Sequence, residues 1–319
     1  QQRLASNPVY RGTLVSEDGS LVSLSFAIHA DQGGFRKIMD GVQKVIDEHH
    51  APDLKITASG SPVFFAAVER FAQRMAILFP IALVIIGLIH LEAFRTVQGL
   101  ILPLLTAVLA VIWGLGIMGA VGVPMDAFNA TTPILILAVA AGHAVQILKR
   151  YYEEYDKLTL GGAPGSPQQL NDQAIIQSLS RAAPVMLTAG GVAVLGFFSL
   201  VTFEIATIRT FGLFTGLGIL SALFIELTFI PALRSYLPAP AVKPQVDTGP
   251  RVWDRLADQL TELILKRRGL IVSLFMATAL LSCIGLLFVN KENSTKSYFG
   301  SRLAVYQDDE FLNHKLAGT

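Results

Sequence analysis

Two side chains that can exchange a proton near neutral pH lie inside long apolar stretches of this sequence. His143 stands seven residues before Arg150, and Glu226 stands eight residues before Arg234. If both stretches are helices, each side chain lies roughly 10 to 12 Å from its basic residue along the helix axis. Histidine changes charge near neutral pH, and a carboxyl group kept from water is more easily protonated, so the two could pass a proton between them. The alternatives are a hydrogen-bonded core histidine and a glutamate that reaches toward the end of its stretch.

Two further polar residues are predicted at a similar depth. Thr188 stands seven residues after Arg181, in a stretch that we expect to run in the opposite direction, and Gln146 is one helical turn past His143. Polar groups inside a membrane are costly and usually mark a pathway or a relay. Thr188 and Gln146 therefore join His143 and Glu226 as candidates for a proton relay, although ordinary packing would also accommodate them.

The remaining histidines indicate no metal site. His90 and Glu92 lie beside Arg95 at the end of an apolar stretch, where polar residues are ordinary, and His49 and His50 have no third ligand at a suitable spacing. The sequence also lacks a nucleophile–base pair or a phosphate-binding loop. We expect neither a cofactor nor an enzymatic activity.

Small residues surround His143. They are Ala138, Ala140, Ala141, Gly142 and Ala144. Small residues let helix backbones approach closely in lipid, where packing holds helices together. The helix that carries His143 should lie at the centre of a bundle, with Ala140, Gly142 and Ala144 against another helix, which could come from a second half of the same polypeptide.

Six apolar stretches could each cross a membrane as a helix. They cover residues 75–94, 99–119, 130–148, 184–201, 211–233 and 270–289. Each is close to the roughly 20 residues that a bilayer core requires. The composition agrees, because 52% of residues are hydrophobic and only 15% are charged, against about 25% charged in soluble domains. The sequence predicts a polytopic α-helical membrane protein.

The distribution of Lys and Arg predicts the orientation. Residues 149–183 and 234–269 are rich in basic residues, whereas 120–129 contain none and 202–210 contain only Arg209. Basic connections stay on the cytoplasmic side. The segments before residue 75 and after residue 289 should therefore share the outer side. The net charge of +1 gives no indication of nucleic-acid binding.

The first outer segment is expected to have an α+β fold. Apolar and polar residues alternate over 22–28, and Asp18-Gly19 suits a tight turn after a partner strand at 10–15. An amphipathic helix over 35–49 and a third strand over 54–58 would complete a β-β-α-β order. This order predicts part of a ferredoxin-like unit.

Two helices outside the apolar stretches are also predicted. Ser61-Pro62 is a strong helix start, and the next breaker is Pro80, so one helix should run from the outer segment directly into the membrane. Residues 253–264 carry an apolar stripe opposite acidic and basic residues, which favours a helix lying on the membrane surface. The Gly- and Pro-rich segments 158–170 and 238–250 are predicted to be linkers. Cys283 is the single cysteine, so no disulfide is possible within the chain.

The sequence resembles the resistance-nodulation-division (RND) superfamily, in particular its lipid-exporter-like branch of MmpL and hopanoid transporters. The most specific match is Lys149-Arg150-Tyr151-Tyr152-Glu153-Glu154, which is similar to the R-[YF]-R-E-E ending of helix four in that superfamily. The family usually has Asp-Tyr eight and seven residues before that Arg, where this sequence has Gly142 and His143. His143 and Glu226 could replace the aspartate, the relay could lie in another part of the protein, or this member could work without protons.

The resemblance implies a domain order for the whole chain. Its parts would be the end of a first periplasmic domain (1–61), a five-helix bundle (62–237), a cytoplasmic connector (238–268), a seventh helix (269–290) and the start of a second periplasmic domain (291–319). Both ends look cut, so a longer polypeptide with a second half is expected. The bundle also resembles sterol-sensing domains.

The expected function is proton-coupled export of hydrophobic molecules or lipids, with a sterol- or hopanoid-like substrate as one candidate, across a bacterial inner membrane. Expected partners are the substrate, membrane lipids, the second half of the polypeptide and periplasmic proteins. One alternative is a lipid-sensing or scaffolding membrane protein with no transport cycle. A SecDF-like accessory of protein export is a weaker alternative.

Overall fold

The computed structural model describes residues 12–28, 34–49, 51–126, 128–240, 252–289 and 299–316. The chain divides into two compact units, one formed by residues 1–240 with 301–319 and the other by residues 241–300. Within these described ranges, six helices are long and apolar enough to cross a membrane. Five belong to the first unit and one to the second, and each unit is described by itself below.

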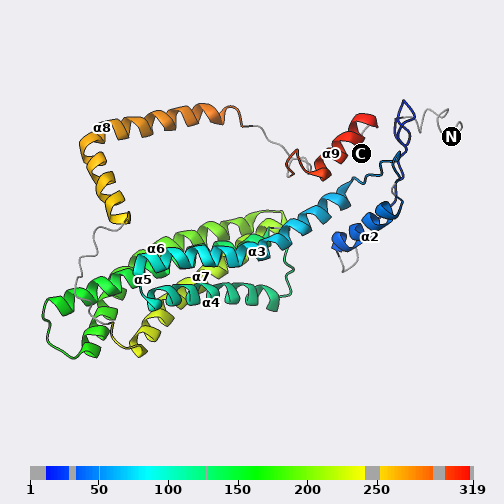
Figure 1. The fold of residues 1–319 in the computed structure, drawn as a ribbon. Helices are drawn as coiled ribbons and strands as arrows, with labels where there is room; N and C mark the ends of the chain where they lie inside the picture. Colours follow the sequence, from blue (N-terminus) through cyan, green and yellow to red (C-terminus); the bar gives the residue numbers. More distant parts are fainter. Residues whose placement is uncertain are drawn as a thin grey trace. The chain divides into compact units, whose positions relative to one another are not determined.

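Five long helices form a bundle in the first unit (Figure 1). They are α3 (Ser61–Phe94), α4 (Val97–Ala120), α5 (Thr132–Leu160), α6 (Pro167–Phe198) and α7 (Ala206–Tyr236). Short 3₁₀ turns, η1 (Asn129–Thr131) and η2 (Ser199–Thr202), precede α5 and follow α6. Helix α5 contacts all four other helices of the bundle, so it occupies the central place.

Local sequence signals fix where these helices begin. The hydroxyl of Thr96 accepts a hydrogen bond from the Gly99 amide at 3.0 Å and caps α4. Ser166 and Gln169 form a reciprocal capping box at the start of α6, with Pro167 in the first turn. Only residues 161–166 connect α5 to α6, so the linker predicted over 158–170 is shorter than expected.

Both helices of that pair extend well beyond their apolar stretches because polar contacts join them. The Glu154 carboxylate, which is 3% exposed, accepts a hydrogen bond from Arg181 of α6 at 2.6 Å and pairs with Lys157 at 3.3 Å. The Tyr151 hydroxyl donates to Asn171 of α6 at 2.6 Å. These contacts stabilise the α5–α6 hairpin beyond its apolar stretches.

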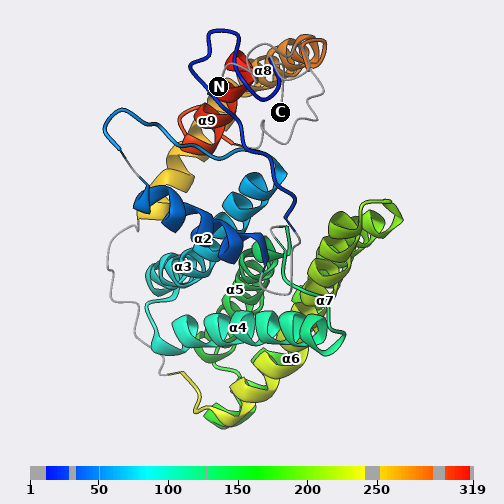
Figure 2. The same ribbon diagram turned by 90° about the vertical axis from the view of Figure 1, so that its right-hand side faces the viewer.

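The outer segment contains one helix that is docked onto the extension of α3. Helix α2 (Gly34–Glu48) lies beside α3 (Figure 2). The Glu69 carboxylate of α3 accepts hydrogen bonds from the backbone amides of Phe35 (3.2 Å) and Arg36 (2.8 Å). A negative charge at a helix N-terminus satisfies free amides and interacts favourably with the helix dipole. The predicted continuous helix is confirmed, because α3 runs unbroken from the outer segment into the bundle.

The expected ferredoxin-like fold of the outer segment is not supported. Within residues 12–28 and 51–60 there is no strand, only isolated antiparallel bridges between Val15 and Val22 and between Ala51 and Leu54. Leu24 is 86% exposed, so the alternating residues of 22–28 bury no face. Two short paired segments are marginal without further strands or a packed helix, which explains why the pattern alone does not produce a sheet here. Residues 10 and 11 of the expected partner strand, and His50, lie outside the described residues.

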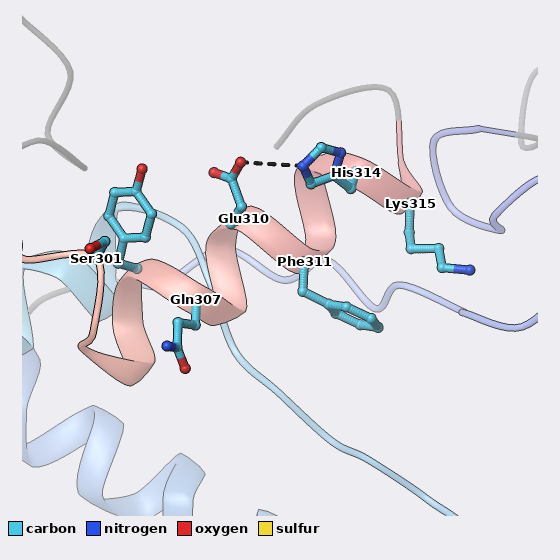
Figure 3. Close-up of a pocket in the computed structure, with 7 residues that line it drawn as sticks. Ser301, Gln307, Glu310, Phe311, His314 and Lys315 are labelled. Atoms are coloured by element: carbon cyan, nitrogen blue, oxygen red, sulfur yellow. Dashed lines mark ion pairs between the residues drawn. The ribbon is translucent and has the colours of Figure 1, made fainter.

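A last helix, α9 (Ala304–Lys315), packs beside the outer segment. The Ser59 hydroxyl donates to Asp309 at 2.7 Å, and Lys55 pairs with Asp308 at 3.4 Å. Figure 3 shows the open pocket along α9, where His314 pairs with Glu310 at 3.3 Å. The first and last described segments thus meet in the structure.

Asp18 and Lys315 make a further contact between these segments. Lys315, with the hydroxyls of Ser16 and Ser20, holds the pKa of the Asp18 carboxyl well below its usual range. The contact is exposed, so solvent screens it.

The second unit contains α8 (Val252–Leu286). Its backbone leaves helical geometry at Arg267 (φ −124°, ψ 31°), and Figure 1 shows a sharp bend in the ribbon of α8. The predicted helix over 253–264 is present before the bend, and the sixth apolar stretch follows it. The orientation of the first part along a membrane surface stays a prediction.

Candidate functional site

Helices α5 and α7 run parallel and keep a constant register. Three side-chain contacts between them join residues that are 83 apart in sequence. These are Thr132 Oγ1 with Thr215 Oγ1 at 3.0 Å, His143 Nδ1 with Glu226 Oε2 at 3.5 Å, and the Arg234 guanidinium with the Tyr151 ring at 4.7 Å. Along each helix the steps are 11 and 8 residues, about three and two turns, so the same faces meet each time.

The central contact joins His143 to Glu226. The Glu226 side chain is fully buried, and that of His143 is 12% exposed. Nδ1 of His143 and Oε2 of Glu226 lie 3.5 Å apart, within ion-pair distance when the imidazole carries a proton, and both Glu226 oxygens and His143 Nδ1 lack a hydrogen-bond partner in the described part of the chain. A buried carboxylate without donors is costly, so this group either takes a proton or relies on the charge of the imidazolium.

Small and apolar neighbours on both helices hold the pair in place. His143 lies between Ala140 and Ala144, which are fully buried in the bundle, and Glu226 follows the buried Ala222 and Ile225. Gly142 is exposed, and a Cβ built there would have no neighbour within 4 Å. Helix α5 therefore has one face packed in the bundle, with Ala140 and Ala144, and one open face beside His143.

The other two relay candidates do not join the pair. Thr188 is exposed, and its hydroxyl donates to the Pro184 carbonyl of its own helix at 2.8 Å. Gln146 is exposed on the open face of α5. The expectation of one polar level shared by three helices is therefore corrected: α6 directs its threonine away from the pair.

His90 is buried, contrary to the expectation of an ordinary interfacial position. It is 4% exposed, its Nδ1 lies 2.6 Å from the Ile86 carbonyl oxygen, and its Nε2 has no hydrogen-bond partner among the described residues. Its neighbours Glu92 and Arg95 do pair at the surface, at 3.0 Å. His90 lies on the face of α3 that packs against the bundle. Its position near the end of an apolar stretch did not predict this burial.

Sequence reasoning missed the two polar levels on either side of the pair. Arg234 is 1% exposed, and its Nη1 and Nη2 donate to Gln98 at 2.6 Å and to the Pro238 carbonyl at 3.2 Å. Thr132 and Thr215 are fully buried at the other end. A usable signal existed, because both helices place a threonine 11 residues before their ionisable residue.

The fold and the buried pair define a polytopic α-helical membrane protein with an ionisable site inside its bundle. The MMPL family model matches residues 2–262, and the chain belongs to that family. The chain is also similar to a protein of Methanocaldococcus jannaschii named "Putative membrane protein MJ1562", with 28% identity over 205 residues, which are 64% of this chain and 50% of that protein. The chain spans about half the length of this curated relative.

Proposed function

We propose that this chain forms part of an RND-type transporter that exports hydrophobic molecules or lipids from the cytoplasmic membrane and is driven by protons. The observation that carries the proposal is the His143–Glu226 pair, buried between two central helices of an MMPL-family membrane protein. The bundle offers few other ionisable groups. The described apolar stretches of α4 and α6 contain none, and that of α3 contains His90 and Glu92.

Protonation of the pair can change how α5 and α7 pack. An imidazolium facing a carboxylate attracts it with on the order of 4 kcal/mol at an effective dielectric constant of about 20. Adding or removing one proton cancels this attraction. A two-state equilibrium needs about 5.5 kcal/mol to move from one state to the other almost completely. The change in this interaction on protonation is therefore of the same order as the free energy that a switch between two helix arrangements requires.

Helix α3 offers a route from the bundle to the outer segment. It contacts α5 within the bundle, and Glu69 on its extension caps α2. Because α3 is continuous, a shift or rotation in the membrane would move α2 with it. We propose that this motion opens and closes the outer path of the substrate.

Membership of the MMPL family supports a hydrophobic or lipid substrate. We propose a lipid or another hydrophobic molecule, with a sterol- or hopanoid-like compound as one candidate, a second half of the same polypeptide, and a protein on the outer side that receives the substrate. The protein would lie in the cytoplasmic membrane with its outer segments on the far side.

Transport by the full-length protein in proteoliposomes tests the proposal. With a fluorescent lipid as cargo and an imposed pH gradient, His143→Leu and Glu226→Gln should each lower gradient-driven transport by at least about tenfold. Thr188→Val is the matched control, because Thr188 is exposed and bonded within its own helix; it should transport like the wild type. Gradient-driven transport by a folded His143→Leu variant at the wild-type rate would refute the relay.

A lipid sensor without a transport cycle is the second candidate. Gly142 and His143 at the positions of the family's Asp-Tyr favour it. In that case no cargo would cross the membrane at any gradient, although added lipid would still change the protection of α5 against hydrogen exchange.

A further inference from the structure

We call the line of side chains along which α5 and α7 touch, from Thr132 and Thr215 to Tyr151 and Arg234, the α5–α7 seam. From the central pair it continues toward the outer side. Its outer end holds Asn129, Thr132 and Thr215, all fully buried. Asn129 Nδ2 donates to Thr210 Oγ1 at 3.2 Å, and the hydroxyls of Thr132 and Thr215 lie 3.0 Å apart. Polar groups are thus present on both helices where the seam begins.

One polar atom of the Asn129 side chain makes no hydrogen bond to the described residues. Its Oδ1 is buried and has no hydrogen-bond partner among the described residues. An unsatisfied buried acceptor costs about 1–3 kcal/mol, and a water molecule is the usual remedy where further polar groups are near. Its backbone amide is fixed by Asp126 Oδ1 at 2.8 Å, so the side chain is held at the outer end of the seam.

An apolar barrier separates this outer end from the central pair. Thr132 and His143 are 11 residues apart, roughly 16 Å along the helix, which is too far for direct proton transfer. Ile136 lies between them and is fully buried. Its Cδ1 fills a notch made by two glycines, because a Cβ on Gly218 would lie 2.0 Å from it and a Cβ on Gly114 would lie 2.9 Å from it.

A second apolar level lies on the cytoplasmic side of the pair. Ile147 and Ile230 are also 83 residues apart, both are buried, and they belong to one apolar cluster. The Tyr151–Arg234 contact follows one turn further. From Thr132 to Tyr151 the seam extends roughly 28 Å, close to the thickness of a bilayer core.

We propose that the α5–α7 seam is the proton path of this protein, with water bound by Asn129, Thr132 and Thr215 at its entrance, Ile136 as the outer barrier and Ile147–Ile230 as the inner barrier. This inference rests on the proposed proton-coupled function and adds its route. A proton arrives on water, is transferred to the Glu226 carboxylate or to the His143 imidazole, and leaves to water on the other side. No other bond forms or breaks. The other ionisable groups in the apolar stretches of the bundle, His90 and Glu92, belong to α3 and to neither helix of this seam.

Proton leak into proteoliposomes, measured with a pH-sensitive dye and no cargo, tests the route in the full-length protein. The two barriers are proposed to open in turn, so in Ile136→Ala, which lacks the outer one, protons pass whenever the inner barrier opens. The leak should rise by about tenfold or more, and Glu226→Gln in the same chain should abolish the increase. Leu137→Ala is the matched control, because Leu137 is an equally buried neighbour on α5 that does not fill the glycine notch; its leak should stay at the wild-type level.

A milder variant and an entrance variant complete the test. Ile136→Val keeps most of the packing and should leak measurably if Ile136→Ala does not fold. Thr215→Val, an isosteric change, should slow gradient-driven transport several-fold without any leak.

The route is overturned if folded Ile136→Ala and Ile136→Val leak no more than Leu137→Ala. It is also overturned if filling the open face of α5 by Gly142→Leu blocks proton uptake while Thr215→Val does not, since protons would then enter beside Gly142. If either result is found and His143→Leu still abolishes transport, the route is refuted and the proposed function stands. Unchanged transport in His143→Leu would refute the proposed function instead.

Discussion

At the scale of single residues, the chemistry depends on how few hydrogen-bond partners the buried Glu226 carboxyl group has. Most buried carboxylates in proteins accept several hydrogen bonds or face a close cation. Glu226 accepts no hydrogen bond within the described part of the chain, and its one ionisable neighbour there is the His143 imidazole at 3.5 Å. Burying a carboxyl group with so few partners costs free energy, so its presence favours a functional role.

This reasoning predicts that Glu226 destabilises the protein. Replacing Glu226 by Met, which has a similar shape and no charge, should raise the free energy of unfolding by about 1–4 kcal/mol, because the cost of burying the carboxyl group disappears. The thermal midpoint of the detergent-solubilised protein checks this. The same change at the exposed Glu153 should have little effect, and a lower midpoint for Glu226→Met would mean that Glu226 is a structural residue.

At the scale of the helices, the position of the pair depends on how α4, α5 and α7 approach one another. Gly114 of α4 and Gly218 of α7 form the notch that receives Ile136 of α5. In lipid, such close contacts hold helices together because apolar burial adds little. The notch keeps α5 and α7 in the register that brings His143 to Glu226.

A double-mutant cycle measures this contact. Gly218→Ala should destabilise the bundle by about 1–3 kcal/mol, because its methyl group would overlap Ile136. Adding Ile136→Ala should recover much of that loss. Gly116→Ala is the control, since a Cβ there has no neighbour within 4 Å. Additive effects of the two changes would show that Ile136 does not lie against Gly218.

The sequence alone predicted the helices of the bundle, the continuous α3 and the location of His143 and Glu226 inside long apolar helices. Long apolar stretches and a Ser-Pro start are local signals, and they determine these features directly. It did not predict the register of α5 against α7, the direction of Thr188 or the burial of His90, because these depend on packing between distant segments. The predicted strands at 22–28 and 54–58 are wrong for the described residues, since alternation marks an apolar face but provides no strand to pair with.

At the scale of the whole chain, the first and last described segments meet through Asp18, Ser59 and Lys55 on one side and α9 on the other. If all six candidate helices of the described residues cross the membrane, both segments lie on one side of it, and this contact agrees with that prediction. Residues that lie far apart in sequence therefore build one outer structure.

The pH dependence of this outer contact can be predicted. The pKa of Asp18 is lowered in the folded protein, chiefly by Lys315. The stabilisation is thus present above the ordinary pKa of Asp, about 3.9, and is lost as the pH falls through the lower folded value. The protection factor of the α9 amides, in which the intrinsic pH dependence of hydrogen exchange is divided out, should be unchanged from neutral pH to about pH 4 and should fall, giving faster exchange than this correction accounts for, only in stronger acid. Asp18→Asn should give the faster exchange already at neutral pH, and no difference there would show that the contact does not hold α9.

The most direct test of the account is whether Glu226 gains and loses a proton with the transmembrane pH gradient. Infrared difference spectroscopy of the full-length protein in lipid, before and after a gradient is imposed, detects the stretching band of a protonated carboxyl group. We expect a band change that is absent in Glu226→Gln and altered in His143→Leu, while Thr188→Val behaves as the wild type. A spectrum in which the gradient produces no band change assignable to Glu226 would contradict the proposal that the His143–Glu226 pair drives transport.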